Sequence, residues 1–547
     1  MITSQILYQR FYRILFLLLM CYFSFFVNNR LIYADIMESR NLVTAREIVT
    51  DGNWIIPTMN GELRLEKPPL PTWIAAGVEL VSPDNLVLQR AMAGLAATML
   101  VFFLYGLATL FTRDHWFALM SAVLLCTSFN IILMGRTATW DIYCHAFMLG
   151  AIYYFFKGGQ KEGSCWKELL LAGFFLGLSF LGKGPVSFYA LLLPFLLAYF
   201  IVFRPSFRGK GWPVICMVLI CLVISLWWPV LLYVNHREIA LSVWNKESTA
   251  WLERSVRPWY YYWKFFAESG IWALFLVTAL IWPYWKKRVQ WKKEYLFSVC
   301  WVFLILICLS LLPEKKTRYL LPILIPSALV IAFLFRYWFA LKNELPRQEK
   351  WIIRINTCVI AGLVSLLPIG IGIFFLNSLG IGFFIFITIV LEAIALWLFR
   401  AALKERAFAF LGGILMLFFI VDVFLLPAVV GLFNNPELNS IHAVRNIPEL
   451  KDIPFYYDKK DELRIEIVYE AGRKILPRSF QEGTDMPELP FALVSQEKAE
   501  EVLPESWLEK VQLKVIGIYD DNKRPAGSSL HSPKFVHQVT LITPREN

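Results

Sequence analysis

The sequence predicts an all-α polytopic membrane domain followed by a small C-terminal α/β domain. Of its 547 residues, 58% are hydrophobic and only 17% are charged, whereas a soluble domain carries roughly 45–50% apolar and about 25% charged residues. The mean hydropathy is +0.55. A soluble protein of this composition would expose large apolar patches to water. A cytosolic enzyme, a disordered chain and a fibrous protein are therefore excluded.

Thirteen stretches are apolar and long enough to be candidate membrane spans, since a spanning helix needs about 20 mostly apolar residues. The first follows Arg10 and Arg13 as a signal peptide would. It lacks a small-residue cleavage site, so we expect an uncleaved anchor. The candidate spans are 11–28, 88–111, 115–134, 139–156, 168–183, 185–203, 213–234, 269–285, 295–312, 319–340, 352–376, 380–399 and 408–431.

Lysine and arginine concentrate in alternate connections between these spans. Examples are the connections 157–167, 286–293 and 336–354. Because cytoplasmic loops carry the excess of basic residues, this pattern predicts a cytoplasmic N-terminus in a bacterial inner membrane. An odd number of spans then places the C-terminal domain in the periplasm. Most of the net charge of +11 thus reflects membrane topology, and no nucleic-acid partner is expected.

Three segments on the predicted outer face are longer than simple connectors. Residues 29–87 and 235–268 form outer loops of the membrane domain, which we expect to cover residues 1–431. Residues 432–547 form the soluble tail. Its short apolar runs alternate with polar helical stretches, as in a small α/β domain. These runs are Ile453–Tyr457, Phe491–Val494, Lys514–Tyr519 and Val536–Ile542.

A few cations on the outer face break the charge rule. Arg136, Lys183 and the group Lys315, Lys316 and Arg318 all lie at span ends, at the depth of lipid phosphates. One such cation is equally well explained by a side chain reaching the lipid headgroups. Three separate sites on one face favour a shared anionic ligand, such as a lipid-linked phosphate.

Carboxylates occur on the same predicted face. Asp35 and Glu38 follow the first span, Glu66 stands beside Lys67, and Asp141 opens the fourth span. Such acids commonly pair with a neighbouring arginine. Beside phosphate-binding cations, however, a carboxylate suits glycosyl transfer from a lipid phosphate. A base takes the acceptor's proton while cations stabilise the departing phosphate.

Motifs for bound nucleotides or metals are absent from the sequence. It contains no P-loop, no dinucleotide-binding glycine motif at a strand–helix turn and no H-E-x-x-H. The nine cysteines show no metal-binding spacing. No cofactor is therefore expected.

Several runs resemble one family. Residues Met37–Ala76, with "AREIVTDGNWIIP" and "EKPPL", resemble the first outer loop of the protein O-mannosyltransferase and aminoarabinose (lipid A) transferase superfamily. These are membrane glycosyltransferases of the C fold that use polyprenyl-phosphate sugars. The runs "RTATWDIYCHAF", "GKGPVSFYALLLP" and "KKTRYLLPILIPSALV" resemble later motifs in the same order. The resemblance covers roughly residues 1–430. The tail resembles the family's C-terminal domain only in its position along the chain.

The resemblance implies roles for individual residues. The family's first loop usually opens with Asp-Glu, whose Asp is the favoured base, but here Met37 replaces that Asp. Glu38 or Asp35 would then serve, and we favour Glu38 because it keeps its place relative to Arg40. The candidate set contains catalytic Glu38, Asp35 and Asp141, donor-phosphate ligands Lys67, Lys183, Lys315, Lys316, Arg318 and Arg136, and cavity residues Arg40, Glu66, Glu247, Arg257 and Tyr319.

The implied activity is inverting transfer of a sugar from polyprenyl (undecaprenyl) phosphate to a lipid A-like lipid or a protein acceptor. We expect a monomer that needs no nucleotide or obligatory metal. Some relatives bind a metal through the Glu before Lys and a His of the second loop. No His occurs between His236 and His442, so that metal site is not expected. A bound divalent cation is kept as an alternative.

Two other classes of function compete with this interpretation. A transporter or flippase of polyprenyl-linked glycans would place ionisable residues in mid-span. Here such acids are few, Glu392 and Asp422 among them, and the charges gather at the outer interface. A structural partner with a binding tail would leave the outer-face cations unexplained.

Overall fold

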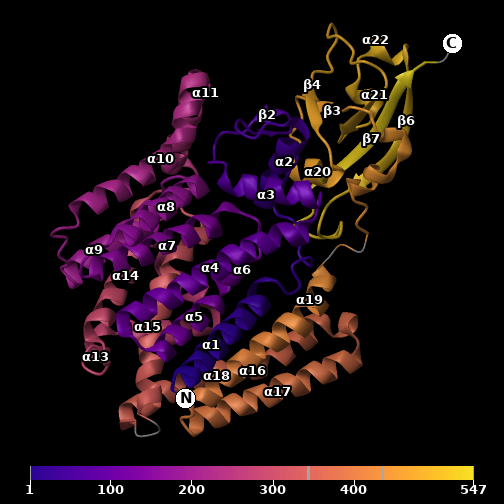
Figure 1. The fold of residues 1–547 in the computed structure, drawn as a ribbon. Coiled ribbons are helices and arrows are strands. Elements are labelled where there is room, and N and C mark those ends of the chain that lie inside the picture. Colours follow the sequence, from indigo (N-terminus) through magenta and orange to yellow (C-terminus); the bar gives the residue numbers. More distant parts are fainter. Residues whose placement is uncertain (1, 342–344, 434, 436, 546–547) are drawn as a thin grey trace. The chain divides into compact units, whose positions relative to one another are not determined.

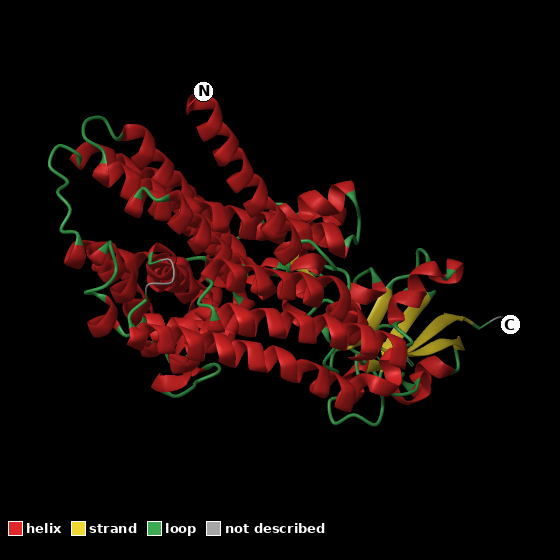
Figure 2. Ribbon diagram, turned by 90° about the horizontal axis from the view of Figure 1, so that it is seen from below, coloured by secondary structure: helices red, strands yellow, loops and turns green. Residues whose placement is uncertain are grey.

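The computed structural model describes residues 2–341, 345–433, 435 and 437–545. It is largely helical, with one five-stranded sheet (Figures 1 and 2). The chain divides into two compact units. Unit 1 comprises 1–29, 65–71 and 87–427, and unit 2 comprises 30–64, 72–86 and 428–547. Unit 2 therefore combines most of the first outer segment with the C-terminal tail.

Unit 1 is built from helices, the last of which continues into unit 2. Two π-helical turns, η1 (Phe188–Leu192) and η4 (Val421–Leu425), and two 3₁₀ segments, η2 (Trp259–Trp272) and η3 (Thr317–Leu320), interrupt the α-helices. The α-helices are α1 (Ile2–Phe25), α4 (Leu86–Thr112), α5 (His115–Cys126), α6 (Phe129–Gly135), α7 (Trp140–Gln160), α8 (Trp166–Lys183), α9 (Leu193–Val202), α10 (Gly211–Asn235), α11 (Arg237–Glu253), α12 (Ala273–Ala279), α13 (Trp282–Trp285), α14 (Lys292–Leu311), α15 (Leu321–Ala340), α16 (Arg347–Leu379), α17 (Ile381–Leu403), α18 (Ala407–Ile420) and α19 (Leu426–Phe433).

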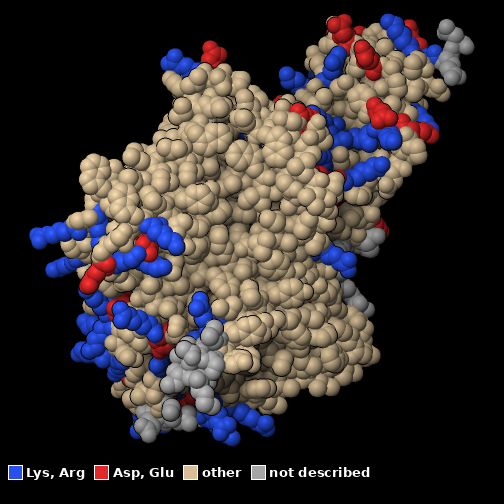
Figure 3. Space-filling view, viewed as in Figure 1, with Lys and Arg blue, Asp and Glu red and all other residues tan. Residues whose placement is uncertain are grey.

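Seven helices within the described residues are long and apolar enough to cross a membrane, or eight if the pair α5 and α6, bent by 68°, is one span. The face of unit 1 in Figure 3 shows a broad area without charged residues. The prediction of a polytopic helical domain is therefore confirmed. The number of thirteen spans stays a prediction. In the structure, the predicted span 269–285 contains the end of η2 and two short helices, α12 and α13.

Small residues bring α7, α8 and α10 close together. A Cβ atom at Gly182 would lie 3.1 Å from the Cα atom of Cys144. The Ser179 hydroxyl donates a hydrogen bond of 2.6 Å to the Cys144 carbonyl. Glycine and serine at such contacts let membrane helices approach closely. This packing sets the end of α8 against the start of α7, where two charged residues meet.

Unit 2 contains a mixed sheet with strand order β4-β3-β5-β7-β6. Strand β3 is parallel to β4 and β5, whereas β7 is antiparallel to β5 and β6. Phe480, Phe491 and Trp507 belong to its core. The strands are β3 (Phe455–Asp458), β4 (Ile475–Arg478), β5 (Phe491–Ser495), β6 (Val511–Asp520) and β7 (Val536–Pro544), with helices α20 (Ile465–Ala471), α21 (Ala499–Val502) and α22 (Glu505–Leu508) and 3₁₀ turns η5 (Ile441–Asn446), η6 (Pro448–Leu450) and η7 (Pro533–Phe535).

The four predicted runs of the tail became strands β3, β5, β6 and β7, so the predicted C-terminal sheet is confirmed. The sequence analysis missed β4. That strand contains Pro477 and lies at the edge of the sheet, where a residue without an N–H donor is tolerated.

The first outer segment contributes α2 (Ile36–Asp51), β1 (Thr58–Met59), β2 (Glu62–Leu63) and α3 (Leu70–Val81). Asn60 and Gly61 connect β1 to β2 with φ of 54° and 80°, as a tight hairpin turn requires. The Asn60 side chain also bonds both backbone groups of Ile475, at 2.8 Å and 2.6 Å. This turn thereby attaches the hairpin to strand β4.

Candidate functional site

Asp141 and Lys183 form a buried ion pair at the meeting of α7 and α8. Asp141 lies in the first turn of α7, and Lys183 is the last residue of α8. Gly184 follows with a φ of 69° and ends the helix. The two side chains are only 2% and 7% exposed, and the Lys183 ammonium donates to the Asp141 carboxylate. The charges of the Asp141 carboxylate and the Lys183 ammonium thus neutralise each other inside unit 1.

Three cations surround the ring of Tyr319. Lys183, Lys316 and Arg318 lie 5.0 Å, 5.8 Å and 5.9 Å from its centre. Arg318 also acts electrostatically on Asp141. Three cations that the sequence analysis singled out therefore meet at one aromatic side chain.

Glu314 links this group to the second outer loop. Its carboxylate accepts from Lys316 at 2.5 Å, from Arg254 at 3.1 Å and from the Tyr319 hydroxyl at 3.4 Å. Burial would raise the pKa of Glu314, but Lys316 and Arg254 outweigh it and lower the pKa. The sequence analysis missed this residue, although it directly precedes the Lys315-Lys316 pair.

Lys67 belongs to the same electrostatic group. Burial lowers its pKa, Glu247 acts in the opposite direction, and the charges of Lys183 and Arg254 lower it further. Its ammonium lies 2.8 Å from the Glu247 carboxylate, while Lys246 lies 3.2 Å from Glu66. Two residues of α11 thus pair with these neighbouring charges, Lys246 with Glu66 and Glu247 with Lys67.

Two predicted phosphate ligands, Lys315 and Arg136, and the predicted cavity residue Arg257 have other surroundings. The buried Lys315 directs its ammonium to the carbonyl of Leu312. Arg136 bonds Asp422 at 2.6 Å and two backbone carbonyls of α1 at 2.6 Å and 2.8 Å. Arg257 is exposed, and its backbone N–H donates to Pro313 at 3.3 Å. These contacts hold the fold together and do not bring the three side chains to the Tyr319 cluster.

A pocket with an apolar wall opens beside the Tyr319 cluster. Its polar members are His145, Glu314 and Tyr319, and Tyr189 also faces it. The apolar wall is made by Val186, Ala190, Leu309 and Leu312. Such a pocket suits a ligand with a polar head and an apolar chain. The sequence places His145 one helical turn after Asp141, but it was not among the predicted site residues.

The acids of the first loop lie in unit 2 and cap helix α2. One oxygen of Asp35 accepts from the N–H groups of Met37 and Glu38, each at 2.8 Å. The Glu38 carboxylate accepts the Asp35 N–H at 3.4 Å, which completes a capping box. Glu38 is only 1% exposed. The D-x-x-E spacing would have indicated this structural role from the sequence.

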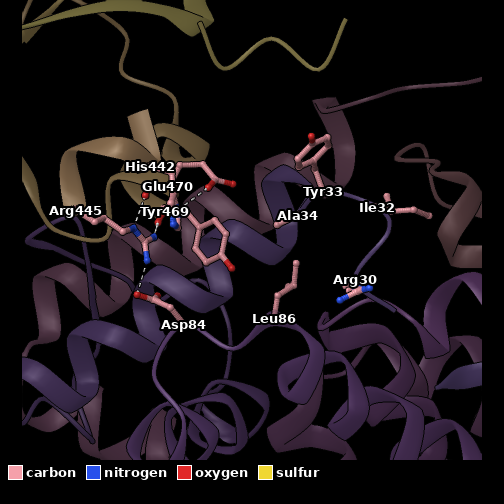
Figure 4. A pocket seen from close by; sticks show the side chains of 10 residues that line it. All are labelled: Arg30, Ile32, Tyr33, Ala34, Asp84, Leu86, His442, Arg445, Tyr469 and Glu470. Atoms are coloured by element: carbon pink, nitrogen blue, oxygen red, sulfur yellow. Dashed lines mark hydrogen bonds and ion pairs between the residues drawn. The ribbon is translucent and has the colours of Figure 1, made fainter. Parts of the chain in front are cut away.

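A pocket of unit 2 lies between first-loop and tail residues (Figure 4). Arg445 lines it and donates to Asp84 at 2.7 Å and to the carbonyls of Tyr469 and Glu470, both at 2.6 Å. His442 lies 3.5 Å from the Glu470 carboxylate, whose pKa is raised by burial. The sequence analysis predicted no functional residue in this part of the tail.

The residues at Glu66 do not fit the metal site that some relatives of the resembled family have. Lys246, a cation, pairs with the Glu66 carboxylate. Across the described residues, no group of three or more His, Cys, Asp or Glu side chains is arranged to hold a metal ion. We therefore assign no reaction step to a metal.

Comparisons with known proteins find one family model and a solved structure that resemble this chain. Residues 66–228 match the dolichyl-phosphate-mannose-protein mannosyltransferase family. The structure resembles that of ArnT from Cupriavidus metallidurans bound to undecaprenyl phosphate, with a TM-score of 0.68, 14% identity and 98% coverage of each chain. The two proteins therefore share a fold. The chain is thus similar to members of the protein O-mannosyltransferase and aminoarabinose transferase superfamily, the family that its sequence resembles.

Two curated relatives match part of the chain. An uncharacterized protein of Aquifex aeolicus is 27% identical over 57% of this chain and 60% of its own length. The undecaprenyl phosphate-alpha-4-amino-4-deoxy-L-arabinose arabinosyl transferase of Yersinia enterocolitica is 24% identical over 56% of each chain. The chain thus spans less than two thirds of the length of these relatives.

Proposed function

We propose that this protein transfers a sugar from a polyprenyl-phosphate donor to an acceptor, either a lipid A-like lipid or a protein hydroxyl. One observation carries the proposal. Lys183, Lys316 and Arg318 surround Tyr319 beside a pocket with an apolar wall. Fixed cations of this kind stabilise the charge that develops on a departing phosphate. The apolar wall suits the isoprenoid chain of the same ligand.

In the proposed reaction the acceptor oxygen attacks the anomeric carbon of the donor. A carboxylate base, for which Glu38 is the candidate predicted from the sequence, takes the acceptor's proton, the new C–O bond forms, and the bond to phosphate breaks. The electron pair leaves with the polyprenyl phosphate, whose charge Lys67, Lys183, Lys316 and Arg318 stabilise. Direct displacement inverts the anomeric carbon. A lipid phosphate is an adequate leaving group, so the reaction as proposed needs neither a nucleotide nor a metal ion.

The proposed setting is a bacterial inner membrane. The basic connections between the spans favour a cytoplasmic N-terminus, thirteen spans and a periplasmic C-terminal domain. The protein is proposed to act as a monomer. A transporter of polyprenyl-linked glycans remains the competing function, and the following assay separates the two.

Membranes that contain the protein are supplied with radiolabelled polyprenyl-phosphate sugars, and the lipid and protein fractions are analysed for label. We expect the label to enter one of the two fractions. Movement of intact donor across the membrane without transfer to any acceptor would support the transporter instead. Absence of transfer with several different sugars would overturn the proposal.

Two substitutions test the base and spare the helix cap. Glu38→Gln keeps an acceptor for the Asp35 N–H, because the third position of a capping box takes Glu or Gln. Asp35→Asn keeps a good N-cap residue. We expect Glu38→Gln to abolish transfer and Asp35→Asn to retain it, with both proteins folded. Full transfer by Glu38→Gln would show that Glu38 is not the base.

A further inference from the structure

Among the described residues, one ring nitrogen of the buried His145, beside the Tyr319 cluster, has no hydrogen-bond partner. His145 is 1% exposed, and its Nδ1 atom has no hydrogen-bond partner among the described residues. Most buried polar side-chain atoms are bonded to protein or to ordered water. A buried polar group left unbonded destabilises a protein, because it has lost its hydrogen bonds to water. This unbonded atom therefore needs an explanation.

The surroundings of His145 identify the kind of ligand. It lines the pocket walled by Val186, Ala190, Leu309 and Leu312. It also lies one turn after Asp141 on α7, within the electrostatic reach of Asp141 and Lys183. A ligand bonded to this imidazole would thus have an anionic or polar group near Lys183 and an apolar chain along the pocket wall.

We propose that His145 binds the phosphate end of the polyprenyl donor, where the isoprenoid chain enters the pocket. This inference rests on the proposed function. The imidazole donates a hydrogen bond to a phosphate oxygen, and the first isoprenoid unit contacts Ala190 and Leu309. Lys183 neutralises charge on the phosphate, whereas His145 fixes the direction in which the chain leaves it. A phosphate ester with an apolar chain satisfies both requirements.

Binding measurements on the purified full-length protein test the proposal with two probes. Undecaprenyl phosphate carries both the chain and the phosphate, while undecaprenol lacks the phosphate. His145→Leu removes the hydrogen bond, and we expect it to weaken binding of undecaprenyl phosphate about tenfold. Its binding of undecaprenol should stay unchanged. His145→Asn places a polar atom close to the position of Nδ1 and should retain most of the affinity for undecaprenyl phosphate.

Two further variants serve as controls. Ala190→Phe fills the pocket and should weaken binding of both probes. His537→Leu removes another buried histidine, 3% exposed and located in β7 of unit 2, and should leave both affinities unchanged. Thermal unfolding checks that each variant is folded. If His145→Leu does not fold, His145→Gln replaces it, because its amide lies near the position of Nε2 and should bind undecaprenyl phosphate more weakly than His145→Asn.

Equal binding of undecaprenyl phosphate by wild type and His145→Leu would overturn the inference and leave only an internal water as the partner of His145. Equal loss of both probes in His145→Leu would also overturn it, since the histidine would then only shape the pocket. Failure of the wild type to bind undecaprenyl phosphate would instead defeat the proposed function itself.

Discussion

Replacing Lys183 with methionine is expected to destabilise unit 1 strongly. Methionine keeps an unbranched chain of similar length, so the main loss is the charge. The carboxylate left behind, Asp141, is only 2% exposed. Removing one partner of a buried ion pair typically costs about 3–5 kcal/mol, because the other charge stays buried and uncompensated. Unfolding by denaturant in detergent micelles, compared with wild type, measures this loss.

A second substitution separates stability from catalysis. Adding Asp141→Asn to Lys183→Met removes the stranded charge, so we expect at least about half of the lost unfolding free energy to return. Sugar transfer should not return, because the proposed ligand of the donor phosphate is still missing and the predicted catalytic carboxylate of Asp141 has become an amide. Lys514→Met is the control. It breaks a pair with Glu449 in which the two side chains are 56% and 53% exposed, and exposed pairs contribute at most about 1 kcal/mol.

Two results would refute this reasoning. A Lys183→Met protein as stable as wild type would show that the pair is not buried as described. Recovery of both stability and sugar transfer in the double variant would show that Lys183 acts only in the structure. In that case, the phosphate ligands would have to be sought among Lys67, Lys316 and Arg318.

Three further predictions concern both units. Burial raises the pKa of Asp521 to about 6, and the unfolded carboxyl titrates near pH 4. The protonated carboxyl of Asp521 therefore contributes fully to stability below about pH 4, and this contribution is lost as the pH rises to about 6. The thermal unfolding temperature of Asp521→Asn should depend less on pH over this interval than that of wild type. Asn60→Ala removes two hydrogen bonds to Ile475 and should destabilise unit 2 by about 1–3 kcal/mol, measured by limited proteolysis. Glu247→Gln removes a competitor for the Lys67 ammonium and should tighten undecaprenyl phosphate binding; weaker binding would contradict that role.

The parts of the site that could be predicted share one physical origin. Lys183, Lys316 and Arg318 stood out because each breaks the positive-inside rule in the predicted topology, and this pattern is readable along the chain. The contacts that distinguish Arg136 from these three cations could not be predicted from the charge pattern. Its carboxylate partner, Asp422, lies 286 residues later in the sequence. No local pattern encodes such a contact, since it depends on how the helices of unit 1 pack.

The Glu66-Lys67-Pro-Pro motif shows why a short motif can be more informative than its single residues. Residues 65–71 belong to unit 1, while the segments on either side, 30–64 and 72–86, belong to unit 2. The chain therefore passes from one unit to the other twice within a few residues. Pro68 and Pro69 restrict the backbone there, and α11 holds the two preceding charges through Lys246 and Glu247. The restricted backbone at Pro68 and Pro69 limits the positions that Lys67 can take. The two prolines and the ion pair with Glu247 therefore both restrict the Lys67 side chain.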